Sequence, residues 1–304
     1  MLFRSHLDDF VRSHKTDLKA DVVVISDSAM FARGVPSICY GLRGLVYFQI
    51  DLRGSSTDLH SGSFGGAVAN PAFVLAQMIA QMKDRGGRIK IPGFYDDVQP
   101  LQDEERKAWA SLPFNERQYR KDFGLPKVFG ESGFTTLERT WARPTLEVNG
   151  LLSGFTGEGA KTVLPAVSMA KISMRLVPDQ EPNKIAELFE AFVRKLAPKT
   201  VELKITRMHG GKPWMTSFDN PFVQAAGRAI EQGFGQAPVF TREGGSIPVV
   251  STFQEELDLP SVLFGVGLPD ENAHAPNEKL DVSNFHNGII ASAILYQEIG
   301  QMRV

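Results

Sequence analysis

Residues 37–53, SICYGLRGLVYFQIDLR, predict two successive strands, SICYGLRG and LVYFQIDLR, because both runs are rich in apolar, β-branched and aromatic residues. The run DVVVISD at residues 21–27 precedes them and has the composition of a central strand that is buried on both faces. Asp27 would then lie at the carboxyl end of that strand, where open α/β sheets bind their ligands. This part of the chain therefore predicts an α/β sheet with a polar site at one edge.

The rest of the chain follows two patterns. The central part has the mixed strands and helices of an α+β unit, with an elaborated insertion at residues 86–145. From residue 220 helices alternate with the strand SVLFG, which is an α/β pattern. The other predicted helices are residues 5–20, 71–83, 102–109, 181–196 and 221–232, a helix from EGGSIP to residue 257, and residues 283–302. The other predicted strands are residues 145–150, 167–177 and 201–208. We expect an α/β domain formed by residues 1–43 and 214–304, interrupted by a smaller α+β domain at residues 44–213.

The composition excludes several classes of protein. Of the 304 residues, 42% are hydrophobic and 22% are charged, which is typical of a globular chain and not of a disordered one. A net charge of −2 provides no general attraction to nucleic acid. Cys39 is the only cysteine, which excludes an intrachain disulfide and a multi-thiolate zinc site. Because the sequence has neither a membrane-spanning apolar run nor the apolar core of a secretory signal, we expect a cytoplasmic protein.

Asp27 and His274 are candidate metal ligands. His274 lies in the polar loop GLPDENAHAPNEKLD directly after SVLFG, and Asp27 holds the same kind of position after DVVVIS. Carboxylate and imidazole groups at strand ends suit zinc or a similar divalent ion. An aspartate after a strand is equally often the cap of a helix, so these two residues alone leave both interpretations open.

Two other segments are candidate binding sites. In TREGGSIPVV, Gly244, Gly245 and Ser246 lead into a predicted helix whose N-terminal N–H groups would attract a carboxylate or phosphate, although an ordinary glycine-rich helix entry fits as well. Glu243 beside them adds a charge that could hold one end of a zwitterion. In DLHSGSFGG, His60 lies between turn residues, where its ring is either exposed for chemistry or caps a helix.

A serine hydrolase is the weakest of the competing chemistries. Ser168 to Lys171 matches the S-x-x-K pattern, but that mechanism needs the pair on one turn of a helix, and this segment has strand character. Cys39, in the apolar run SICYG, is interpreted as a core residue and not as a nucleophile.

Six segments, in order, resemble the zinc-dependent dipeptidases of the carnosine dipeptidase type, which belong with the acetylornithine deacetylase and succinyl-diaminopimelate desuccinylase metallopeptidases. They are SDSAMF, YGLRGL, DLHSGSFGG, GAKTVLPAVSMAKISMRLVPDQ, TREGGSIPVV and ENAHAPNEKLD. The resemblance implies a two-zinc catalytic α/β domain, interrupted by a lid domain that forms a homodimer. It implies hydrolysis of dipeptides or N-acyl amino acids by metal-activated water, with manganese or cobalt as alternatives to zinc.

The resemblance also assigns roles to individual residues. Asp27 and His274 would each bind one of the two metal ions, and His60 would be a catalytic histidine that reaches the active site of the other subunit. The residues implied in substrate binding are Thr162 and Arg175 for the carboxylate, Glu243 for the amino group, and Gly245 and Ser246 for further contacts.

This sequence departs from the family pattern in one respect. The family's H-x-D motif, its bridging aspartate and its Glu-Glu pair have no counterpart here. The family's spacing would place the Glu-Glu pair just before residue 1, so we expect a catalytic domain that is incomplete at its N-terminus. On this basis the chain as given is expected to bind metal weakly and to be inactive, and the alternative function is a dimerising remnant without catalysis.

Overall fold

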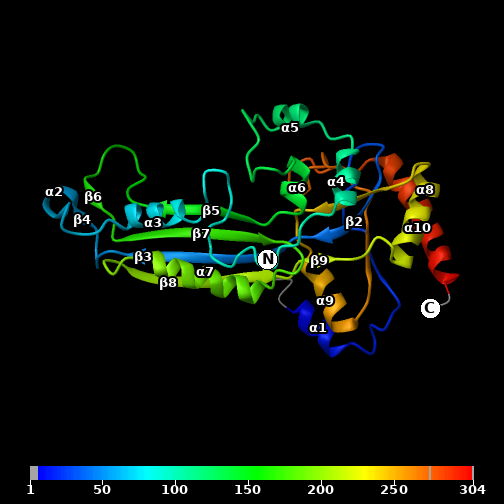
Figure 1. Ribbon diagram of the computed structural model, residues 1–304, viewed down its shortest axis with the longest axis horizontal. Coiled ribbons are helices and arrows are strands. Elements are labelled where there is room, and N and C mark those ends of the chain that lie inside the picture. The colour runs from blue at the N-terminus through cyan, green and yellow to red at the C-terminus, as the bar shows by residue number, and fades with distance from the viewer. Residues whose placement is uncertain (1–5, 274, 303–304) are drawn as a thin grey trace. The chain divides into compact units, whose positions relative to one another are not determined.

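The computed structural model describes residues 6–273 and 275–302, which form two compact units (Figure 1). Unit 1 contains the described residues of Met1–Leu42, Leu101–Pro113 and Trp214–Val304. Unit 2 contains Arg43–Pro100 and Phe114–Pro213. The predicted mixed architecture, an α/β part interrupted by an α+β part, is confirmed.

Unit 2 is built on a four-stranded antiparallel sheet in the order β5-β7-β3-β8. The strands are β3 (Gly44–Arg53), β5 (Thr145–Ser153), β7 (Val167–Leu176) and β8 (Glu202–Gly211). Buried and more exposed residues alternate along β3, because successive side chains of a strand point to opposite faces. All four strands were predicted from the sequence, but their order in the sheet was not, and the strand LVYFQIDLR pairs with both β7 and β8.

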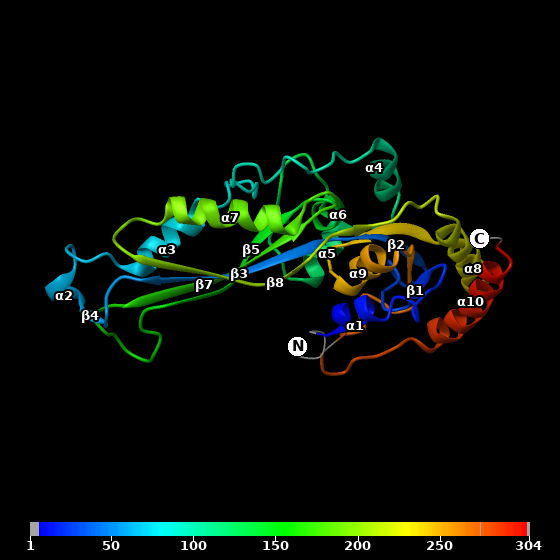
Figure 2. The same ribbon diagram turned by 90° about the horizontal axis from the view of Figure 1, so that it is seen from below.

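Two helices, α3 (Pro71–Ala80) and α7 (Pro182–Leu196), cover one face of this sheet (Figure 2). Phe48 of β3 and Phe189 of α7 are both fully buried, with ring centroids 4.6 Å apart. The apolar side chains of α7 recur at helical spacing, so burying one face of the helix removes most of them from water. The core of unit 2 therefore lies between the sheet and these two helices.

The remaining elements of unit 2 are short. Strands β4 (Leu59–His60) and β6 (Val163–Leu164) pair with each other, and α2 (Ser61–Phe64) follows β4 directly. The predicted insertion contains α5 (Glu116–Asp122) and α6 (Thr136–Trp141). A capping box between Thr135 and Glu138 begins α6, because each side chain satisfies a main-chain N–H of the first turn.

Unit 1 contains a second sheet in the order β1-β11-β2-β10, with β9 also paired to β2. Its strands are β1 (Val23–Ile25), β2 (Ser37–Leu42), β9 (Trp214–Met215), β10 (Val239–Glu243) and β11 (Ser261–Phe264). Two helices, α8 (Pro221–Phe234) and α10 (Val282–Gly300), bury apolar residues against Ile38, Val262 and Phe264 of this sheet. Two further helices, α1 (Leu7–Ser13) and α9 (Pro248–Leu257), lie together, and Thr252 of α9 donates a hydrogen bond to Asp8 of α1 at 2.7 Å.

The prediction of a central strand at DVVVISD was wrong. Among the described residues β1 pairs only with β11, and Val24 is 40% exposed. A short apolar run has the same composition in the middle of a sheet and at its edge, since only the neighbouring strands distinguish the two. The helix predicted at residues 5–20 is also shorter, because regular α-helix ends at Ser13.

Residues 101–113, expected with the smaller domain, belong to unit 1. Helix α4 (Asp103–Ala110) carries Glu105, which forms an ion pair with Arg242 of β10 and accepts a 2.6 Å hydrogen bond from the hydroxyl of Tyr40. Trp109 of the same helix is buried, and the Arg242 guanidinium lies 5.4 Å from its ring centroid. These interactions connect positions 65 or more residues apart, so periodicity along the chain could not predict them.

Asp281 is the N-cap of helix α10, and its negative charge stabilises the fold. Asp281 accepts hydrogen bonds from the Ser283 hydroxyl at 2.6 Å, from Arg33 at 2.6 Å and from the Asn284 N–H at 3.1 Å. These interactions, led by the Ser283 hydrogen bond, hold the pKa of Asp281 well below its usual value. A carboxylate with a depressed pKa stabilises the fold above the pKa of the unfolded state, and that contribution disappears as the pH falls through the folded pKa.

We therefore expect Asp281→Ala to lower the midpoint of urea unfolding at about pH 7, and the difference from the parent protein to shrink towards about pH 3. Urea titrations followed by circular dichroism at several pH values measure this effect. Asp21→Ala, which removes an exposed aspartate of the same unit, is the control. A difference that stays constant over this pH range would contradict the assigned role of the Asp281 charge.

Candidate active site

The loop that carries Asp27 runs beside the loop that follows β11. Strands β1 and β11 are parallel, so both loops leave the same edge of the sheet. The Met30 N–H donates to the Gly267 carbonyl at 2.8 Å, and a Cβ on Gly265 would lie 1.6 Å from the Ser28 carbonyl oxygen. Only glycine at position 265 permits this approach of the two backbones. His274 belongs to the loop after β11 and lies outside the described residues.

Glu243 ends β10 and is half-buried. Burial raises the pKa of its carboxyl group, and the negative charge of Asp27 raises that pKa further. The two carboxylates thus lie within electrostatic reach of each other. Gly245 and Ser246 lie between β10 and α9, whose first residue is Pro248. Strand β10 was not predicted, because the glycines of TREGGSIPVV indicate only the entry to a helix.

The described residues fit a divalent cation only in part. Asp27 and Glu243 provide two hard oxygen donors whose mutual repulsion a cation would relieve. No group of three or more His, Cys, Asp and Glu side chains that could hold a metal ion occurs within residues 6–273 and 275–302. A complete coordination shell would therefore need a ligand from outside this set, such as His274.

In unit 2, His60 and Thr162 lie together. His60 is the N-cap of α2, and its Nδ1 accepts hydrogen bonds from the N–H groups of Gly62 at 3.1 Å and Ser63 at 3.3 Å. Because Nδ1 is the acceptor, the proton of the neutral ring is on Nε2, which lies 3.4 Å from the Thr162 hydroxyl. Both side chains are exposed. The helix-capping alternative for His60 is thus correct, and it leaves an N–H of the ring directed away from the cap.

Arg175 of β7 lies opposite Leu45 of β3, two residues after Arg43. Burial lowers the pKa of Arg175 and also lowers that of Arg43 to about 10, with the positive charge of Arg175 as the second cause. Arg43 belongs to the segment YGLRGL, but no role was predicted for it. Its position just before a strand that pairs with the strand of Arg175 is the signal that could have placed the two together.

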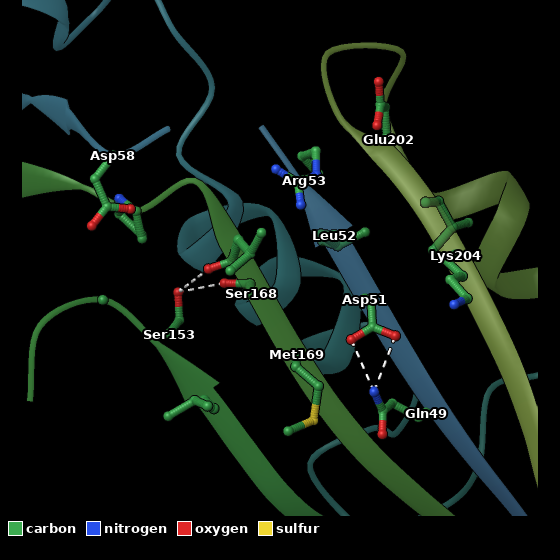
Figure 3. Close-up of a pocket in the computed structure, with 15 residues that line it drawn as sticks. Gln49, Asp51, Leu52, Arg53, Asp58, Ser153, Ser168, Met169, Glu202 and Lys204 are labelled. Carbon is green, nitrogen blue, oxygen red and sulfur yellow. Dashed lines mark hydrogen bonds between the residues drawn. The ribbon is translucent and has the colours of Figure 1, made fainter. Parts of the chain in front are cut away.

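A pocket of about 790 Å³ lies elsewhere in unit 2, and none of the predicted site residues lines it (Figure 3). It lies over the sheet, where Asp51 accepts two hydrogen bonds from Gln49 and pairs across the strands with Lys204, while Arg53 pairs with Glu202. Opposite charges on neighbouring strands are typical of a solvated sheet face. The size of this pocket alone therefore does not identify a catalytic site.

The rejection of a serine hydrolase is confirmed for the pair considered. Ser168 and Lys171 lie on β7, three positions apart, so their side chains point to opposite faces of the sheet. Ser168 is buried and hydrogen-bonded to Ser153, which Figure 3 shows. Cys39 is buried as expected, and burial raises the pKa of its thiol, so it has no nucleophilic character.

None of the described helices is long and apolar enough to cross a membrane.

The predicted site residues thus fall into two sets. Asp27, Glu243, Gly245 and Ser246 belong to unit 1, while His60, Thr162 and Arg175 belong to unit 2. Within each unit the structure brings some members together, namely Asp27 with Glu243 and His60 with Thr162.

Comparisons with known proteins give one consistent result. Residues 40–201 match the peptidase dimerisation domain, which is more than half of the chain. The Cys-Gly metallodipeptidase DUG1 of Candida albicans is 38% identical over 275 residues, 89% of this chain and 56% of that protein. The crystal structure of human carnosine dipeptidase 1 matches with a TM-score of 0.80 and 30% identity, covering 98% of this chain and 64% of that one.

A third relative is an M20 family metallo-carboxypeptidase, Sso-CP2 of Sulfolobus solfataricus, with a TM-score of 0.88 and 30% identity. The match covers 97% of this chain and 67% of the chain in that structure. The resemblance to dipeptidases of the carnosine dipeptidase type is therefore confirmed. The chain spans between about half and two thirds of the length of these relatives.

Proposed function

Because this chain belongs to the M20 peptidase family, as its peptidase dimerisation domain shows, we propose that it hydrolyses dipeptides in a metal-dependent reaction. Similarity to a Cys-Gly metallodipeptidase and to human carnosine dipeptidase 1 over most of this chain supports dipeptides as the substrate class. N-acyl amino acids are the second substrate class, since they contain the same amide and carboxylate.

The observation that carries this proposal is the pair of carboxylates in unit 1. Asp27 raises the pKa of the half-buried Glu243, which is an unfavourable arrangement unless a cation comes close. Two kinds of cation could neutralise this pair of carboxylates, namely a metal ion and the ammonium group of a dipeptide. We assign Asp27 and His274 to metal binding and Glu243 to the substrate ammonium.

The metal centre is proposed to hold two zinc ions, with manganese or cobalt as alternatives. Divalent ions at such a centre polarise a carbonyl group and lower the pKa of bound water towards ~7. Carboxylate oxygen and imidazole nitrogen are both ligands that zinc accepts.

The protein's own residues would bind and orient the dipeptide. Arg175 offers a planar guanidinium for a bidentate interaction with the terminal carboxylate, and Thr162 offers a hydroxyl to the same group. Gly245 and Ser246 would make further contacts from the segment before α9. The Nε2–H of His60 would donate to the oxyanion that forms when the amide carbon becomes tetrahedral.

We further propose a homodimer formed through residues 44–213, with His60 serving the active site of the other subunit. The family match covers most of this segment and names a dimerisation domain. A closed two-fold dimer would place the two exchanged histidines equivalently.

The test is hydrolysis of Cys-Gly and β-Ala-His by the purified chain after treatment with a chelator and dialysis. The relatives are named as dipeptidases, and the comparisons give no support to the inactivity expected from the missing motifs. We therefore expect no hydrolysis by the metal-free protein, and hydrolysis when zinc, manganese or cobalt is added. Asp27→Ala should abolish the response to metal, whereas Asp21→Ala should keep it. Absence of hydrolysis with every metal would contradict the proposed activity and favour the non-catalytic dimer.

A further inference from the structure

Unit 2 contains a second, smaller pocket at the start of β5, which we call the basic pocket. Its volume is about 170 Å³. The charged residues that line it are Arg43, Lys83, Arg139, Arg143, Glu131 and Glu147. Four of these side chains are cationic and two are carboxylates, so the lining carries two more positive than negative charges.

Each of the two carboxylates is engaged by a cation of the lining. Glu131 is 8% exposed and accepts hydrogen bonds from Arg143 at 2.6 and 3.3 Å. Glu147 forms an ion pair with Lys83 at 2.9 Å. Of the other two arginines, Arg43 donates to the main-chain carbonyl oxygen of Arg143 at 3.3 Å and Arg139 donates to that of Glu131 at 3.0 Å.

The cations are held in place by their surroundings. Arg143 is 9% exposed, and its guanidinium lies 4.4 Å from the ring centroid of Phe134. Arg139 lies against Gly130, where a Cβ would come within 2.7 Å of its Cδ. The lining is therefore a prearranged set of donors, which lowers the entropic cost of binding an anion.

Arg43 shows the electrostatic consequence of this arrangement. Burial lowers its pKa to about 10, and the charge of Arg175 acts in the same direction, although Glu147 opposes it. A positive charge in such surroundings is stabilised by an anion that approaches it. The pocket of Figure 3 differs in this respect, because its lining has two cations and three carboxylates.

We propose that the basic pocket binds a compact dianion, namely phosphate, either as the free ion or as the ester of a small molecule. Two excess positive charges match a dianion, and guanidinium groups bind phosphate oxygens in a bidentate manner. The pocket's small volume favours a group of this size over an extended ligand. Arg175 is not among the lining residues, but it lies opposite Thr145 of the lining on the neighbouring strand. The basic pocket therefore adjoins the proposed substrate-carboxylate contact without sharing its arginine, and the proposal does not rest on the proposed function.

Isothermal titration calorimetry at about pH 8 and constant ionic strength tests the proposal, with inorganic phosphate, glycerol 3-phosphate and succinate as ligands. We expect saturable binding of phosphate or of the ester, tighter than that of succinate. Tighter binding of the ester than of the free ion would identify an ester as the ligand. Binding of neither, or tighter binding of succinate, would overturn the proposal.

Two variants locate the site. Arg139→Gln should raise the Kd for phosphate at least about tenfold, because it removes a charge-assisted hydrogen bond. Arg194→Gln, which removes an exposed arginine of α7 in the same unit, should leave the Kd unchanged. Equal affinities of the two variants would overturn the assignment.

A crystal of the parent protein soaked in selenate provides a test that does not depend on the folding of a variant. We expect the anomalous peak of selenium between the guanidinium groups of Arg43 and Arg139. Peaks confined to other places would overturn the proposal.

Discussion

Replacing Phe189 by alanine is expected to lower the free energy of unfolding by about 3–5 kcal/mol. Phe189 is fully buried between α7 and the sheet of unit 2, where its ring contacts that of Phe48. Truncation removes the buried ring and leaves a cavity that the surrounding side chains fill only in part. Urea titration followed by circular dichroism measures the loss, which belongs to the unfolding of unit 2.

Phe73→Ala is the matched control for this variant. Phe73 lies on α3 of the same unit and is 71% exposed. Its truncation should change the free energy of unfolding by no more than about 0.5 kcal/mol. Similar losses for the two variants would contradict the central position of Phe189 in this core.

Replacing His60 by alanine is expected to reduce kcat for dipeptide hydrolysis by about 10²–10³, with little change in metal content. The proposed role of His60 is to donate its Nε2–H to the tetrahedral oxyanion, a contact that exists mainly in the transition state. Steady-state kinetics of the metal-loaded protein measure the effect, which should appear in kcat more than in KM.

His209→Ala is the control for the histidine. His209 is an exposed residue of β8, and its ring stacks on that of Tyr47 with the centroids 5.1 Å apart. The His209→Ala substitution therefore removes the same type of side chain from the same unit. It should keep the kcat of the parent protein. An active His60→Ala protein would rule out the oxyanion role, whereas a parent protein without activity would contradict the proposed function as a whole.

The long strands and helices of both units could be predicted from sequence. Apolar and polar residues alternate from Phe48 to Arg53 in LVYFQIDLR, as expected for a strand with one buried face, and the helix that begins at Pro182 shows a clear apolar stripe. The short elements β4, β6 and β9 could not be predicted, because two residues carry no periodicity. The edge position of β1 depends on which strands lie next to it, which a single segment does not encode.

The candidate site was predicted in pieces and not as an arrangement. Motifs named Asp27, Glu243 and His60, but they gave no information that Asp27 raises the pKa of Glu243 or that His60 caps α2 through Nδ1. Glu105 was missed because its partner Arg242 is 137 residues away in the chain. Such pairs arise from the tertiary fold, and a charged helix segment looks the same whether its glutamate is solvated or buried.

The division of unit 1 into separate segments affects how the chain folds during synthesis. Cys39 of β2 pairs with Thr241 of β10 and with Leu263 of β11, whereas all four strands of the unit 2 sheet lie between these partners in the chain. At ~5–20 residues per second, a ribosome would need on the order of ten seconds or more to reach β10 after completing β2. Unit 2 can therefore fold first, and β2 remains unpaired with β10 and β11 until the last third of the chain has been synthesised. During that interval the unpaired edges and apolar side chains of β2 are exposed, so this segment can bind chaperones or aggregate.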